Sequence, residues 1–154
     1  MDYITVKWLH IISSTLLFGT GLGTAYFMIC AVSTRNAVIV AAVGKNVIIA
    51  DWLFTATTVV IQPITGFYLI YLADIPLTSK WVMWSTGLYL LAGGCWLPVV
   101  WLQMRMHKLA VIARENKTAL PAIFWRYFLT WVTLGIPAFI ALLIVFYLMV
   151  AKPI

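Results

Sequence analysis

The chain has 154 residues, of which 64% are hydrophobic and only 9% are charged, and its formal net charge is +6. A soluble domain of this length carries about 25% charged residues. The composition therefore excludes a soluble globular fold and indicates a lipid bilayer as the surrounding medium. In such a chain the basic excess reports orientation in the membrane, and no nucleic-acid partner is expected.

The first apolar run covers residues 4–32 and is interpreted as a retained membrane span. No basic region precedes it, and it is longer than the apolar part of a signal peptide. The polar segment from Ser33 to Asn36 ends the run. Residues 37–43 are apolar but few, so we expect an interfacial turn or a short helix there.

Three further spans are expected, over residues 47–73, 81–104 and 122–150. Pro76 limits the second span, because proline cannot continue a helix. The third continues as a polar helix through Arg114, and Pro121 opens the fourth, since proline is favoured in the first helical turn. The pattern predicts an all-α membrane protein, a four-transmembrane-helix bundle that forms one domain over residues 1–154.

Basic residues are divided unequally between the two ends of this bundle. The end with the termini carries Lys7, Lys80 and Lys152, and the opposite end carries Arg35, Lys45, Arg105, Lys108, Arg114, Lys117 and Arg126. Basic residues are enriched on the cytoplasmic side of membrane proteins. We therefore expect both termini on the periplasmic or outer side of an inner (cytoplasmic) membrane.

Polar side chains inside a span are costly and point to a role. His10 lies about two turns into the first span and shares a helix face with Ser14 and Gly21. A neutral histidine nitrogen ligates a metal or haem iron, and small residues let a flat ligand approach. The simpler interpretation is a histidine hydrogen-bonded to water or a neighbour. His107 lies at the opposite end, so the second ligand is another side chain such as Met83 or Met149, a residue of a second protomer in a homodimer, or absent, which leaves an open site.

A second polar group is expected at the basic end of the bundle. Asp51 lies at the inner end of the second span, and Arg105 and Arg126 lie at similar depth in the third and fourth. An ion pair between Asp51 and one of these arginines would neutralise the carboxylate and tie the helices together. The alternative is a polar pocket for an anionic group such as a haem propionate or a lipid phosphate.

The second span also contains Gln62 and Pro63. Pro63 leaves one carbonyl of its helix without a donor. Gln62 is expected to bond to that carbonyl or to another helix, either as a contact between helices or as part of a gate or ligand site.

The segment Lys7-Trp8-Leu9-His10-Ile11-Ile12, followed by Gly19, Gly21 and Gly23, resembles the opening of small bacterial membrane proteins. These include the HemJ-type protoporphyrinogen oxidases and the membrane part of CopD-type copper-resistance proteins. The stretches Asp51 to Thr55 and Gln62 to Gly66 are similar to a family known only as predicted integral membrane proteins of unknown function.

The HemJ-type resemblance implies a bacterial inner-membrane protein with haem b bound at His10, and an enzyme of membrane oxidoreductase type. The lysine of the HemJ-type third span has no counterpart within residues 81–104. The resemblance therefore implies haem binding more directly than it implies the oxidase reaction.

Three functions follow from these features. The first is a haem b-binding redox protein, or a subunit of a redox complex, that exchanges electrons with a quinone or a soluble partner. The second is a structural or assembly subunit of a larger membrane complex, with a homodimer as one form of it. The third is a small transporter, for which Asp51 is expected to lie too near one end of its span.

Overall fold

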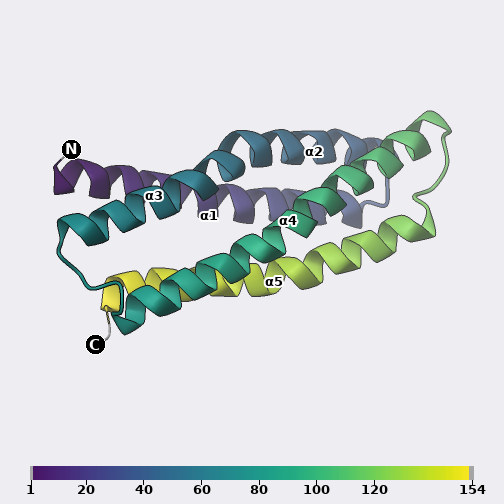
Figure 1. The fold of residues 1–154 in the computed structure, drawn as a ribbon. Helices are drawn as coiled ribbons and strands as arrows, with labels where there is room; N and C mark the ends of the chain where they lie inside the picture. The colour runs from purple at the N-terminus through teal and green to yellow at the C-terminus, as the bar shows by residue number, and fades with distance from the viewer. Residues whose placement is uncertain (1, 153–154) are drawn as a thin grey trace.

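The computed structural model describes residues 2–152, and all of its regular structure in that range is helical. The elements are α1 (Tyr3–Ser33), α2 (Ala37–Ala50), a π-helical turn η1 (Asp51–Thr55), α3 (Ala56–Leu72), α4 (Lys80–Glu115) and α5 (Ala122–Ala151) (Figure 1). Four helices are long and apolar enough to cross a bilayer, because α2, η1 and α3 form one continuous rod. The predicted four-span, all-α fold is confirmed.

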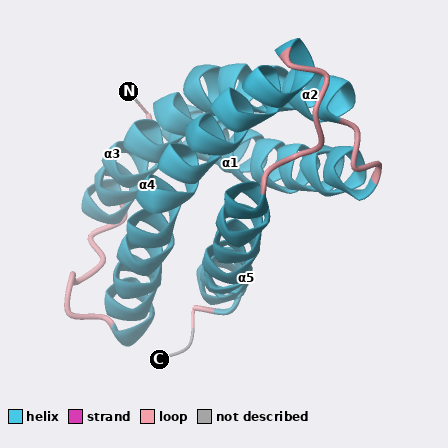
Figure 2. Ribbon diagram, turned by 90° about the vertical axis from the view of Figure 1, so that its right-hand side faces the viewer, coloured by secondary structure: helices cyan, strands magenta, loops and turns pink. Residues whose placement is uncertain are grey.

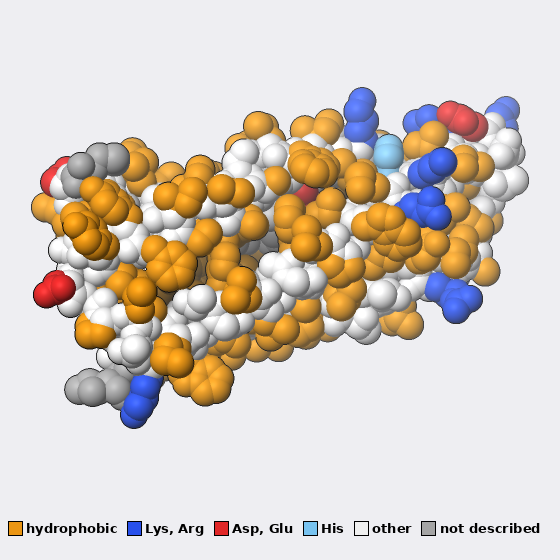
Figure 3. Space-filling view, in the orientation of Figure 1, with side chains coloured by type: hydrophobic (Ala, Val, Ile, Leu, Met, Phe, Trp, Pro, Cys, Tyr) orange, Lys and Arg blue, Asp and Glu red, His pale blue; other side chains and the backbone are white. Residues whose placement is uncertain are grey.

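Both ends of the chain lie at the same end of the bundle, as four crossings require (Figure 1). The α1–α2 and α4–α5 connections lie at the other end. Lys and Arg side chains gather around these connections in the space-filling view (Figure 3). We call the two ends the terminal end and the loop end.

The second spanning rod begins at Ala37 rather than near residue 47. Asn36 starts it, since its side-chain oxygen accepts a hydrogen bond from Val38 N at 2.9 Å. The segment around Gly44 does not interrupt the helix. A Cβ at Gly44 would lie 3.5 Å from His107 Nδ1, an ordinary contact distance, so Gly44 lies on the face of α2 that packs against α4. Residues 44–46 thus continue the helix and form no turn, and Gly44 makes a packing contact.

Apolar packing is concentrated towards the loop end. There α4 packs against α5 and α2, and α1 packs on α2, whereas α1 packs on α3 nearer the terminal end. Phe124, Met28, Met106 and Val40 are among the most deeply buried side chains and belong to one cluster. Towards the terminal end, the start of α1 and the end of α5 lie apart in both ribbon views (Figures 1 and 2).

Candidate functional site

A polar contact joins α1 to α3 in the terminal half. Gln62 Nε2 donates to the backbone oxygen of His10 at 2.9 Å and to Ser13 Oγ at 2.6 Å. Gln62 and Ser13 are both buried. The contact between helices that the sequence suggested for Gln62 is therefore formed, and it fixes the backbone that carries His10.

The carbonyl released by Pro63 is used by a different residue. Proline lacks the N–H that would bond four residues back, which frees the oxygen of Val59. The Tyr89 hydroxyl of α4 donates to this oxygen at 2.7 Å. A helix defect in α3 thus becomes a hydrogen bond that joins α3 to α4.

The hydrogen bonds of Thr65 favour one tautomer of His10. The Thr65 hydroxyl points its hydrogen at backbone oxygens, of Ile61 at 2.8 Å and of Gln62 at 3.2 Å. Its Oγ1 lies 2.7 Å from His10 Nδ1 and can only accept there. These contacts suit the neutral tautomer that carries its hydrogen on Nδ1, in which Nε2 keeps a free lone pair.

Gly66 lies directly against the His10 ring. A Cβ at this position would lie 3.3 Å from His10 Cε1, closer than most side-chain contacts. A side chain at this position would press on the imidazole, which lies against the α3 backbone. The ring is thus fixed on two sides, by Thr65 at Nδ1 and by Gly66 at Cε1.

His10 lies in the wall of a cavity of about 550 Å³, here called the terminal cavity. All four spanning rods contribute to it, and most of its wall is apolar. Lys7 and Lys152, both exposed, lie on its rim at the terminal end. Ser85 Oγ is buried in the wall with no partner among residues 2–152.

The residues predicted to bind a cofactor do not all line the terminal cavity. Ser14 lines the terminal cavity, and its hydroxyl donates to Ile11 O at 2.8 Å. Gly21 lines a second cavity, described below. Met83 is 61% exposed on the outer face of α4, because the buried Val82 and Ser85 set the inward face of that turn. Met83 lines neither cavity, whereas Met149 lines the terminal one.

The second cavity, of about 310 Å³, lies deeper in the bundle and is called the central cavity. Phe18 of α1 stacks on Phe139 of α5 with ring centres 5.0 Å apart, and meets Phe146 edge-on at 5.2 Å. Phe18 lines both cavities. The aromatic contact between α1 and α5 therefore lies at the boundary between them.

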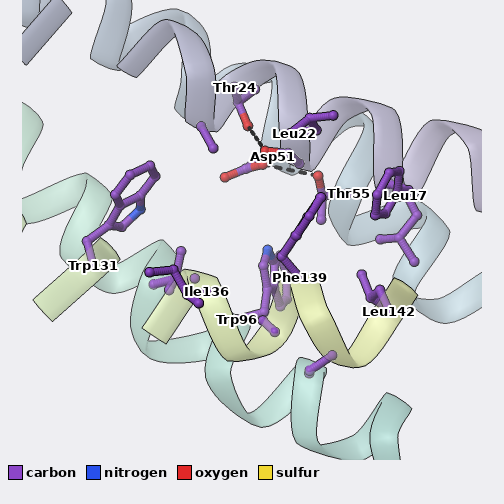
Figure 4. A pocket seen from close by; sticks show the side chains of 18 of the residues that line it. Leu17, Leu22, Thr24, Asp51, Thr55, Trp96, Trp131, Ile136, Phe139 and Leu142 are labelled. Atoms are coloured by element: carbon purple, nitrogen blue, oxygen red, sulfur yellow. Dashed lines mark hydrogen bonds between the residues drawn. The ribbon is translucent and has the colours of Figure 1, made fainter. Parts of the chain in front are cut away.

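Asp51 is the charged side chain of the central cavity and is 4% exposed. It accepts a hydrogen bond from Thr55 Oγ1 at 3.0 Å within the π-helical turn (Figure 4). Such turns are rare and occur often at functional sites. The turn places Asp51 and Thr55 side by side on the cavity wall.

The predicted ion pair of Asp51 with Arg105 or Arg126 is not formed. Within residues 2–152 the only salt bridge joins Arg114 to Glu115, at 3.6 Å. Arg105 is exposed and lies over the Trp101 ring, 5.4 Å from its centre. It follows Gln103 by two residues, which turns it to the opposite side of α4. Gln103, and not an arginine, faces Asp51.

Three polar atoms in the central cavity are buried and lack a hydrogen-bond partner within the described part of the chain. They are Trp96 Nε1, Gln103 Oε1 and Trp131 Nε1. The indole nitrogens of Trp96 and Trp131 face the hollow (Figure 4). The sequence offered one signal for them, since a tryptophan deep in a span needs a partner for its N–H.

No three His, Cys, Asp or Glu side chains come together as a metal-binding group between residues 2 and 152. A ligand at His10 would be held by that one histidine, the cavity wall and the rim.

Comparison with known proteins places almost the whole chain in one family. Residues 4–153 match the family described as "Predicted integral membrane protein (DUF2269)". No curated protein and no solved structure matches the chain.

Proposed function

The chain belongs to this DUF2269 family of integral membrane proteins, and on that premise we propose that it is a haem b-binding redox protein or redox-complex subunit. The haem would lie in the terminal cavity with His10 as its axial ligand.

The contact between His10 Nδ1 and Thr65 Oγ1 is the observation that carries the proposal. Histidines that ligate iron donate their second ring N–H to an oxygen, which fixes the tautomer and the ring plane. His10 Nδ1 has such a partner in Thr65 Oγ1 at 2.7 Å. The remaining nitrogen, Nε2, has the lone pair that iron requires, and the ring lies in the cavity wall.

The cavity suits the rest of a porphyrin. Its volume of about 550 Å³ is in the range of cofactor sites, about 300–1,000 Å³, and its wall is mainly apolar. Lys7 and Lys152 supply positive charge at the rim, where two propionates would emerge. Met149 takes the place of Met83 as the candidate second ligand. Bound haem supplies one-electron chemistry that no side chain here provides.

The distribution of basic residues supports a sidedness for this site. Seven Lys and Arg residues lie beyond or near the loop end, against three near the termini. We infer a cytoplasmic loop end, which places both termini and the terminal cavity towards the periplasmic side of a bacterial inner membrane.

The first test is the absorption spectrum of protein expressed with added haem and purified in detergent. We expect a Soret band, with sharp α and β bands after reduction. Met149→Leu should shift these bands, while the outward-facing Met83→Leu should leave them unchanged. A spectrum with aromatic absorbance alone, from folded protein offered haem, contradicts the proposal.

A structural subunit remains the second candidate, and one observation favours it. A Cβ at Gly19 or Gly23 of α1 would meet no atom within 4 Å, so these glycines serve no packing inside the chain. Small residues on a lipid-facing helix favour contact with another helix. Crosslinking through a cysteine at Gly19 would capture a homodimer or a larger complex, whereas cysteine at the exposed Ile64 should not.

A further inference from the structure

The polar atoms of the central cavity require both acceptors and donors from whatever fills it. The indole N–H groups of Trp96 and Trp131 need acceptors, and Gln103 Oε1 needs a donor. Gln103 and Trp131 are only 4% and 6% exposed, so bulk water does not reach them. Buried polar groups of this kind are nearly always hydrogen-bonded in native proteins.

Asp51 adds a carboxyl group to this set without a cation to balance it. Its partner is the Thr55 hydroxyl, and no basic side chain of the described chain lies within salt-bridge distance. The indole N–H edges that face the hollow are the positive edges of their rings, which disfavours a cationic ligand beside them. The cavity chemistry therefore fits a neutral molecule that carries oxygen atoms able to accept and donate.

The cavity opens towards lipid. Leu22 and Ile29 on α1 and Ile136 on α5 line it and are 49%, 47% and 55% exposed. All three face outward from spanning helices, where hydrocarbon surrounds the protein. A ligand that enters between α1 and α5 at this level comes from the bilayer and carries an apolar tail.

Aromatic rings form much of the wall. Phe18, Tyr89, Trp96, Trp131 and Phe139 come from α1, α4 and α5 and enclose the hollow. Flat faces of this kind favour a planar ring as the occupant.

We propose that the central cavity binds the ring of a lipid-soluble quinone or quinol. The ring oxygens would accept from Trp96 and Trp131, and a quinol hydroxyl would donate to Asp51 or to Gln103 Oε1. The ring would lie against the aromatic wall, with its tail leaving between α1 and α5. This inference stands on the central cavity alone and does not require haem in the terminal cavity.

The test uses the full chain in nanodiscs free of endogenous quinone, titrated calorimetrically with short-chain ubiquinone-1. We expect saturable binding that weakens by about tenfold in Trp96→Phe and in Trp131→Phe, since each keeps its ring and loses one hydrogen bond. Asp51→Asn should lose a comparable factor with ubiquinol-1. Trp101→Phe and Asp74→Asn, which alter exposed residues outside the cavity, should bind as the unaltered chain does.

A second measurement covers any variant that fails to fold. In the unaltered chain labelled with ¹⁵N at the indoles, ubiquinone-1 should shift the Trp96 and Trp131 signals and leave Trp101 unmoved. The haem-free His10→Ala protein should bind ubiquinone-1 equally well, so failure of the haem proposal is distinguishable.

Three outcomes would overturn the inference. They are equal affinity in Trp96→Phe and Trp131→Phe, no saturable binding at all, and tetraphenylphosphonium binding that depends on Asp51 in protein that does not bind the quinone. The last would assign the cavity to lipophilic cations.

Discussion

The loop half and the terminal half of this bundle are held together by different interactions. In the loop half, Met28, Val40, Met106 and Phe124 interlock with at most 1% of their surfaces exposed. In the terminal half, the buried residues of α3 are polar, and Gln62 and Tyr89 connect the helices by hydrogen bonds. Apolar packing closes the first half, while directed polar contacts join the helices around the terminal cavity in the second.

The two halves also differ in the surroundings of their histidines. His107 lies against Gly44, where α2 and α4 are closely packed. His10 lies against Gly66 at the edge of the terminal cavity. Both rings lie against a glycine, but only His10 lines one of the two cavities.

The largest expected stability effect is in the loop half. Phe124→Ala removes a fully buried ring and should lower the free energy of unfolding by about 3–5 kcal/mol. Phe27→Ala, at a ring that is 62% exposed, should change it by less than about 0.5 kcal/mol. Unfolding in mixed detergent micelles measures both, and equal losses would break the distinction between core and lipid-facing positions.

A smaller effect is expected from the polar contact of the terminal half. Gln62→Leu removes the hydrogen bonds to His10 O and Ser13 Oγ and should destabilise by about 1–2 kcal/mol. Ser13→Ala removes only one of them and should cost about half as much. The same unfolding assay tests this pair, and a Gln62→Leu protein as stable as the unaltered chain would show that these bonds do not hold α1 to α3.

Tyr89→Phe tests the carbonyl released by Pro63. The variant leaves Val59 O without its donor and should lose about 1 kcal/mol. Tyr147→Phe, at a residue 68% exposed, serves as the matched control and should lose nothing measurable. If Tyr89→Phe lost no more stability than Tyr147→Phe, Val59 O would have another hydrogen-bond donor in the membrane.

The smallest effect is expected at the start of α1. The Thr5 hydroxyl and then the Thr5 backbone N–H bond to Asp2 and lower the pKa of its carboxyl group. Because the folded pKa is lowered, this stabilisation is present at neutral pH and is lost as the pH falls through it. Protection of the Thr5 amide relative to its intrinsic exchange rate should fall as the pH is lowered, and Asp2→Ala should show the same low protection at every pH.

The number and type of the spans could be predicted from sequence, because long apolar runs and the prolines at positions 76 and 121 are local signals. The start of the second rod could not, since Gly44 resembles a helix break until His107 is seen against it. A hydrogen bond from Gln62 to another helix could be predicted, because a buried amide in a span needs a partner outside its own helix.

The details of both cavities depend on the rotation of one helix against another. Asp51 and Arg105 have similar depth, yet Gln103 faces the carboxylate because α4 presents that side. Met83 is exposed and lines neither cavity, for the same reason. A helix whose faces are all apolar gives no signal for its rotation, so it could not be predicted that Trp96 and Trp131 line the same cavity as Asp51.

The most direct test of the central claim compares the two histidines, one in each half. His10→Ala and His107→Ala proteins, expressed with added haem, are purified and their reduced spectra recorded beside that of the unaltered chain. The account predicts that His10→Ala loses the Soret, α and β bands and remains folded, while His107→Ala keeps them. Haem retained in full by His10→Ala, or lost only from His107→Ala, would contradict it.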